Sequence, residues 1–141
     1  MANTLQRVWQ TVSSACRRCG TMITMTPSIL IVDDHPSFRA MARALLQSEG
    51  YTIVGEAVDG ASALTAVRDL HPEVVLLDVQ LPDTDGFAVA SELTRGTDPP
   101  AIVLTSSRDA SDFGPLIAES GARGFVPKGE LCGRTLAEAL E

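Results

Sequence analysis

The chain has 141 residues, of which 45% are hydrophobic, 4% aromatic and 21% charged, and its formal net charge is -7. This length and composition allow one domain with a mainly aliphatic core. The acidic balance argues against direct nucleic acid binding, which needs a clustered basic face, and no apolar run reaches the roughly 18 residues of a membrane span. We therefore expect a cytoplasmic protein.

The first part of the chain, residues 1–26, differs from the rest in its polar composition and weak periodicity. We predict a mobile N-terminal extension here and a separate domain over residues 27–141. Cys16 and Cys19 have the spacing of a zinc or redox pair, but a structural zinc site needs four ligands and no second pair follows. We interpret the two cysteines as incidental.

From residue 28 the chain alternates between short apolar runs and amphipathic stretches bounded by Gly and Pro. The apolar runs predict strands over 28–32, 51–57, 74–77, 101–105 and 123–126. The amphipathic stretches predict helices over about 36–48, 60–70, 86–95, 110–120 and 130–140. Strict alternation favours a parallel sheet with helices on both faces, and five strands suit the flavodoxin-like (βα)5 order 2-1-3-4-5.

Polar side chains follow four of these strands at the point where each strand ends. Asp33 and Asp34 follow the first, Asp78 the third, and Thr105 and Lys128 the fourth and fifth. The carboxyl ends of parallel strands meet in one crevice, where open α/β sheets bind ligands. Three carboxylates there repel one another unless a cation joins them, and oxygen ligands favour Mg²⁺.

Each of these residues also has a simpler interpretation when it is taken alone. Asp34 is suited to cap the helix that begins near Pro36, Thr105 to be an ordinary strand residue, and Lys128 to be a solvated lysine. Capping does not explain the set as a whole. As a set, Asp78 is the best nucleophile, Lys128 pairs with it, and Thr105 offers a hydroxyl to a phosphoryl oxygen.

Four sequence stretches in order, which together span about residues 28–141, resemble the receiver domain of two-component response regulators of the NarL/FixJ type. The stretches are Ile31-Val32-Asp33-Asp34-His35-Pro36, Leu76-Leu77-Asp78-Val79-Gln80-Leu81-Pro82-Asp83-Thr84-Asp85-Gly86, Val103-Leu104-Thr105-Ser106 and Gly124-Phe125-Val126-Pro127-Lys128. The motif after the lysine departs from many receivers, which have Pro where this chain has Gly129.

The resemblance implies that a sensor histidine kinase phosphorylates Asp78 in a Mg²⁺-dependent reaction. It implies Mg²⁺ ligands from Asp34, Asp78 and the backbone carbonyl of Gln80, with Asp33 acting largely through water. It also implies that Thr105 and Phe125, with Lys128, change the surface around the fourth helix and fifth strand. Such a domain catalyses only its own phosphorylation and dephosphorylation.

Several alternatives concern how the signal leaves the domain. Because the chain ends at Glu141, we expect a stand-alone receiver that acts on a downstream effector protein, with a homodimer left open. The alternative is the receiver part of a transcriptional regulator whose DNA-binding output domain is missing or on another chain. A different class of protein, a Mg²⁺-dependent phosphatase of similar topology, would need a general acid at the position of Gln80. A degenerate receiver that serves only as an interaction module is also disfavoured, because all three acidic residues are present.

Overall fold

Five parallel strands form one sheet in the computed structural model, which describes residues 27–141. The strands are β1 (Ser28–Val32), β2 (Thr52–Ala57), β3 (Val74–Asp78), β4 (Ala101–Ser106) and β5 (Gly124–Pro127). They pair in the order β2-β1-β3-β4-β5, which confirms the predicted order. The three central strands are almost wholly buried, as expected of strands that are apolar on both faces.

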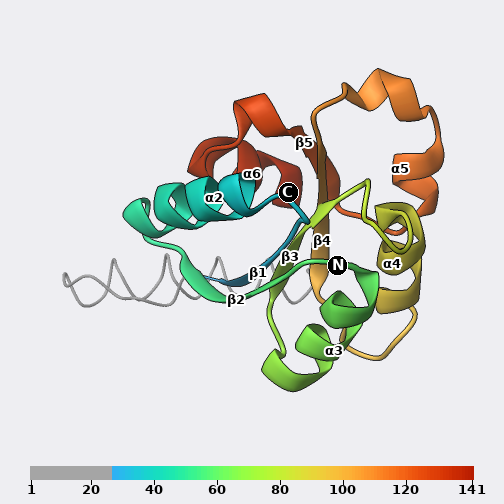
Figure 1. Cartoon of the computed structure of the whole chain (residues 1–141). Helices are drawn as coiled ribbons and strands as arrows, with labels where there is room; N and C mark the ends of the chain where they lie inside the picture. The colour runs from blue at the N-terminus through green and yellow to red at the C-terminus, as the bar shows by residue number, and fades with distance from the viewer. Residues whose placement is uncertain (1–26) are drawn as a thin grey trace.

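Helices cover both faces of the sheet, so the fold has three layers (Figure 1). On one face, α2 (Pro36–Ser48) and α6 (Gly133–Leu140) contribute Leu46 and Leu136 to a core beneath them. On the other face, α3 (Gly60–Leu70), α4 (Gly86–Leu93) and α5 (Leu116–Glu119) cover a second core that includes Ala63 and Val89. This doubly wound arrangement confirms the predicted flavodoxin-like class.

The segment between β4 and β5 is not the single helix that the sequence predicted over 110–120. It forms a 3₁₀ turn, η1 (Ala110–Phe113), followed by the short helix α5. Gly114 lies between them with a φ of +56°, a left-handed conformation that no helix continues through. Pro115 follows and has no N–H to donate, so the hydrogen-bond ladder of a helix cannot bridge the two pieces.

The other helix boundaries lie close to their predicted places. The carboxylate of Asp59 accepts a hydrogen bond from the Ser62 N–H at 2.8 Å and caps α3. Likewise, the Asp85 carboxylate caps α4 by accepting from the Ala88 N–H at 2.8 Å. A second 3₁₀ turn, η2 (Lys128–Glu130), precedes α6 and shortens that helix relative to the prediction.

The predictions for the first part of the chain concern residues outside the described range. They include the extension itself and the pair Cys16 and Cys19. Among residues 27–141, no helix is both long and apolar enough to cross a membrane.

Candidate functional site

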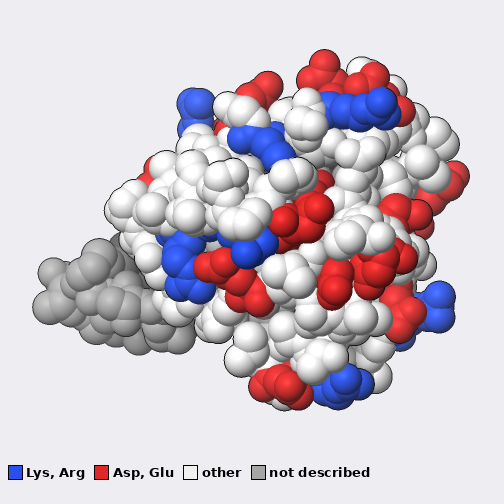
Figure 2. Space-filling model, viewed as in Figure 1, with Lys and Arg blue, Asp and Glu red and all other residues white. Residues whose placement is uncertain are grey.

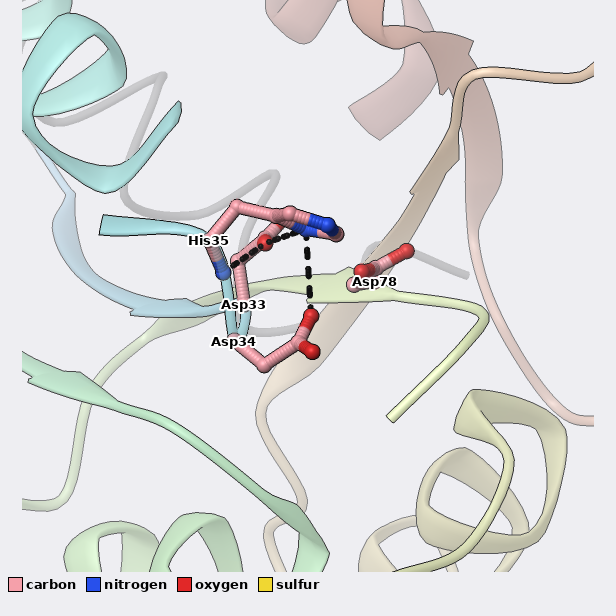
Figure 3. Close-up of side chains that lie close together, drawn as sticks. All are labelled: Asp33, Asp34, His35 and Asp78. Carbon is pink, nitrogen blue, oxygen red and sulfur yellow. Dashed lines mark hydrogen bonds and ion pairs between the residues drawn. The ribbon is translucent and has the colours of Figure 1, made fainter. Parts of the chain in front are cut away.

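Acidic side chains meet where strands β1 and β3 end. The two strands are neighbours, with Val32 opposite Leu77, so Asp33 and Asp34 come beside Asp78. One potential ligand atom from each of these carboxylates, and one from the His35 ring, all lie within 4.8 Å of one another. Figure 3 shows the His35 ring in contact with both Asp33 and Asp34, and Asp78 facing them from the next strand.

Asp33 is fixed by hydrogen bonds to its backbone and to one carboxylate oxygen. Its N–H donates to the Ala57 carbonyl at 3.0 Å, and its own carbonyl accepts from Arg39 Nη1 at 2.7 Å. Its Oδ1 accepts from the His35 N–H at 2.8 Å. Within the described residues, the buried Oδ2 accepts no hydrogen bond, although Lys128 stands close to it as an ion-pair partner. The partner of this buried oxygen is therefore the Lys128 ammonium, a cation, as the burial of a charged carboxylate requires.

Lys128 begins the turn η2 directly after β5 and reaches across to the carboxylates. Its Nζ lies 2.6 Å from Asp33 Oδ2 and 3.4 Å from Asp78 Oδ2. The same ammonium lies 4.7 Å from the centre of the Phe38 ring, within cation–π range. The sequence predicted pairing with Asp78; the structure shows that contact and a shorter one with Asp33.

The charge balance at Asp78 is unfavourable. Asp78 is buried, and burial raises the pKa of its carboxyl above the ordinary value; the charge of Asp33 raises it further. Lys128 and a hydrogen bond from the Gln80 N–H at 3.2 Å act in the opposite direction without cancelling the rise. One ammonium therefore does not neutralise the site, and an added divalent cation would.

The loop after β3 is held in a tight turn against the end of its own strand. The Val79 N–H donates to the Thr105 carbonyl at 2.9 Å, and the Gly86 N–H donates to the Val79 carbonyl at 2.6 Å. A Cβ on Gly86 would lie 2.4 Å from the Asp78 carbonyl oxygen. Only glycine allows this approach, so Gly86 fixes how the loop leaves Asp78.

Thr105 lies opposite Asp78 on the neighbouring strand β4, and Phe125 lies one strand further, on β5. Thr105 is fully buried, and its hydroxyl donates to the Val126 carbonyl at 2.7 Å. The half-buried ring of Phe125 has its centre 5.7 Å from that of Phe113, which in turn lies 5.5 Å from that of Phe87. These three rings form a contiguous aromatic row from β5 across η1 to α4.

Four residues near the site, His35, Arg39, Arg43 and Glu56, were not assigned a place in it by the sequence. Besides donating to Asp33, Arg39 pairs with Glu56 at 2.9 Å, and Arg43 also pairs with Glu56 at 2.6 Å. The Arg43 hydrogen bond is the main cause that lowers the pKa of Glu56, and Arg39 adds to it. The spacing of Arg39 and Arg43 by one helical turn could have indicated that both side chains lie on the same face of α2. Nothing in the sequence indicated that the His35 ring contacts two carboxylates.

The charges around the site are visible on the molecular surface. Figure 2 shows Asp and Glu side chains gathered across the middle of the face seen in Figure 1, with Lys and Arg beside them. Among the charged groups of the site, Asp34 is exposed and Lys128 is half-buried, whereas Asp33 and Asp78 are buried.

The fold and this cluster of three acidic side chains and a lysine at the carboxyl edge of the sheet define the class of two-component receiver domains. Residues 29–140 match the response regulator receiver domain family, and the chain belongs to that family. It is therefore a phosphorylation-dependent signalling receiver, as the sequence predicted.

Relatives of known name agree with this assignment. The DNA-binding response regulator MtrA of Mycolicibacterium smegmatis is 42% identical over 109 residues, which cover 76% of this chain and 46% of MtrA. MtrA of Mycobacterium tuberculosis is 40% identical over 109 residues, covering 76% of this chain and 46% of that protein. The chain thus spans about half the length of the curated relatives it matches.

Solved structures show the same fold. The signal receiver domain of NarL from Mycobacterium tuberculosis has a TM-score of 0.71 and 34% identity, covering 81% of this chain and 96% of that one. The N-terminal receiver domain of Klebsiella pneumoniae RstA, solved in a BeF3-activated form, has a TM-score of 0.70 and 31% identity, with 79% and 93% coverage.

Proposed function

We propose that this receiver accepts a phosphoryl group on Asp78 from the phosphohistidine of a sensor histidine kinase in the cytoplasm. The observation that carries the proposal is the buried Asp78 carboxylate at the end of the central strand β3, with a like charge on Asp33 and the Lys128 ammonium beside it. Burial among charged groups in a crevice is typical of reactive carboxylates.

Transfer of the phosphoryl group involves only the kinase phosphohistidine and the Asp78 carboxylate as reacting groups. One oxygen of the ionised Asp78 carboxylate attacks phosphorus, a new P–O bond forms, and the P–N bond to the kinase histidine breaks. The imidazole leaves with the electron pair of that bond and takes up a proton. Attack of water on the phosphoryl group later returns Asp78 to its carboxylate and releases inorganic phosphate.

We further propose Mg²⁺ as the cation of this site, held by Asp33, Asp34, Asp78 and the backbone carbonyl of Gln80. The carboxylate oxygens of Asp33, Asp34 and Asp78, which lie close together with only Lys128 as a neighbouring ammonium among the described residues, support this ion. When bound, it would neutralise charge on the carboxylates and on the incoming phosphoryl oxygens.

Readout of the phosphoryl group would use Thr105, Lys128 and Phe125. The Thr105 hydroxyl, which donates to the Val126 carbonyl in this structure, would donate to a phosphoryl oxygen instead. Lys128 would pair with the new phosphoryl charge, and the Phe125 ring would move in its row with Phe113. The altered surface around β5 would bind a downstream effector protein.

The test is labelling with acetyl phosphate in the presence and absence of Mg²⁺. Wild-type protein should gain phosphate that hydroxylamine removes, as an acyl phosphate requires, only with Mg²⁺, and Asp78→Asn should gain none. Asp69→Asn, an exposed change on α3, serves as the matched control and should label like wild type. Label on Asp78→Asn would place the phosphoryl group elsewhere.

We also propose that residues 27–141 are the complete receiver unit. Deleting residues 1–24 should therefore leave both folding and labelling intact, and loss of folding would contradict this boundary. A second candidate function, the receiver part of a DNA-binding regulator, is favoured by the half-length coverage of the MtrA proteins. Immunoblotting of the source cells distinguishes the two, because a stand-alone receiver runs near 14.9 kDa.

A further inference from the structure

The loop between β3 and α4 is joined to the start of α3 by the side chain of Asp83. Its Oδ1 accepts a hydrogen bond from the Gly60 N–H at 2.8 Å, and its Oδ2 accepts one from the Ala61 N–H at 3.0 Å. The first N–H groups of a helix have no partner within the helix and carry the positive end of its dipole. A carboxylate there makes charge-assisted hydrogen bonds.

Helix α3 has a cap of its own, so Asp83 supplies something more than capping. Asp59 already accepts from the Ser62 N–H at 2.8 Å, and the Ser62 hydroxyl lies 3.2 Å from the Asp59 N–H to complete a capping box. Asp83 instead comes from the loop that follows Asp78. Its two bonds therefore connect the segment next to the phosphoacceptor with a helix of the preceding βα unit.

Close packing accompanies these hydrogen bonds. A Cβ on Gly60 would lie 2.5 Å from Thr84 Cγ2 and 3.1 Å from Val89 Cγ2, so the contact requires glycine at the first position of α3. Within the loop, the Leu81 N–H donates to the Thr84 carbonyl at 3.2 Å, which makes a tight turn with Asp83 inside it. The turn thus places Asp83 at the start of α3, and the loop is attached to that helix through it.

We propose that Asp83 is a positioning residue that couples the loop carrying the Gln80 ligand, which directly follows Asp78, to the first turn of α3. The inference rests on the proposed function, because that function assigns the cation to this loop. If the bond to α3 is lost, the loop occupies its binding conformation for less of the time, and the apparent cation affinity falls by the same factor. By linkage, a bound cation strengthens the hydrogen bonds from Gly60 and Ala61.

The experiment measures Mg²⁺ affinity by calorimetry and amide hydrogen exchange by NMR in the full chain. Asp83→Ala should bind Mg²⁺ about 2- to 30-fold more weakly, the range that a lost helix cap spans. Mg²⁺ should slow exchange of the Gly60 and Ala61 amides in wild type and leave it unchanged in Asp83→Ala. Asp83→Asn, which keeps one acceptor without the charge, should lie between the two.

Asp59→Ala is the matched control, because it removes the other carboxylate from the same helix start. It should destabilise α3 to a similar degree and still bind Mg²⁺ with wild-type affinity. The coupling is overturned if Asp83→Ala binds Mg²⁺ like wild type or if Asp59→Ala is weakened equally. Asp34→Asn separates the two proposals. If it weakens Mg²⁺ binding and Asp83→Ala does not, only the coupling fails. If wild type binds no Mg²⁺, the proposed function fails with it.

Discussion

The hydrogen bond between the Thr105 hydroxyl and the Val126 carbonyl links β4 to β5 through a fully buried side chain. Thr105→Val keeps the branched shape and removes the donor. The net loss of such a bond is about 0.5–1.5 kcal/mol, and a buried acceptor left unpaired costs about 1–3 kcal/mol. We therefore expect the free energy of unfolding of the metal-free protein to fall by about 1–3 kcal/mol.

Urea denaturation of wild type and Thr105→Val measures this difference. Thr105→Ser retains the hydroxyl and should recover much of the loss. Thr65→Val, an exposed change on α3, should stay within about 0.5 kcal/mol of wild type. Equal stability of Thr105→Val and wild type would show that the bond to Val126 is not held in the resting protein, which would refute the reasoning.

The same substitution bears on the proposed switch, because one hydroxyl hydrogen cannot be donated to two acceptors at once. Thr105→Val should still accept phosphate on Asp78, since the nucleophile and its charged neighbours are unchanged. The NMR signals of Phe125 and Phe113 should then fail to shift on phosphorylation. A wild-type shift in the variant would mean that the aromatic row responds without Thr105.

Two further predictions concern pH and backbone packing. Burial and the neighbouring carboxylate raise the pKa of Asp78, so the ionised form destabilises the metal-free fold. The contribution of Asp78 to the free energy of unfolding should be greatest below its ordinary pKa and should be lost as the pH rises through the raised value. Urea denaturation at a series of pH values from about pH 4 to pH 7 should therefore show a free energy of unfolding that falls with pH, and Asp78→Asn should reduce this dependence. Gly86→Ala should lower the free energy of unfolding by about 1–3 kcal/mol, because the added Cβ would collide with the Asp78 carbonyl oxygen. Thermal denaturation measures this change. Gly96→Ala is the control and should keep the wild-type stability, because the space around Gly96 is open. An unchanged melting temperature for Gly86→Ala would mean that the loop shifts freely.

The strands and their order were predictable because their residues are apolar on both faces. A run such as Val74–Leu77 needs burial on both faces, and the middle of a parallel sheet between two helix layers provides it. The break between η1 and α5 was visible as Gly114 and Pro115, but periodicity across 110–120 outweighed it. Local pattern alone could not show that Gly114 adopts a positive φ or that Phe113 packs against Phe87 and Phe125.

The site residues were predictable as a set, since each follows a strand that ends at the same edge of the sheet. The hydrogen-bond and ion-pair partners of these side chains were not predictable. The sequence contained no sign that the Thr105 hydroxyl donates to Val126 or that Lys128 lies nearer Asp33 than Asp78. Such choices depend on side-chain rotamers and burial in the assembled fold, which spacing along the chain does not encode.

Lys128 lies close to both buried carboxylates, at 2.6 Å from Asp33 and 3.4 Å from Asp78, and its single charge neutralises them in part. Lys128→Met should therefore lower the stability of the metal-free protein by about 3 kcal/mol, as when one partner of a buried ion pair is removed. If Lys128 and Mg²⁺ neutralise the same charges, the variant should bind Mg²⁺ more tightly than wild type, because two cations in one site repel each other. Calorimetry measures this affinity. Weaker binding by Lys128→Met would instead show that Lys128 orients the carboxylates for the ion.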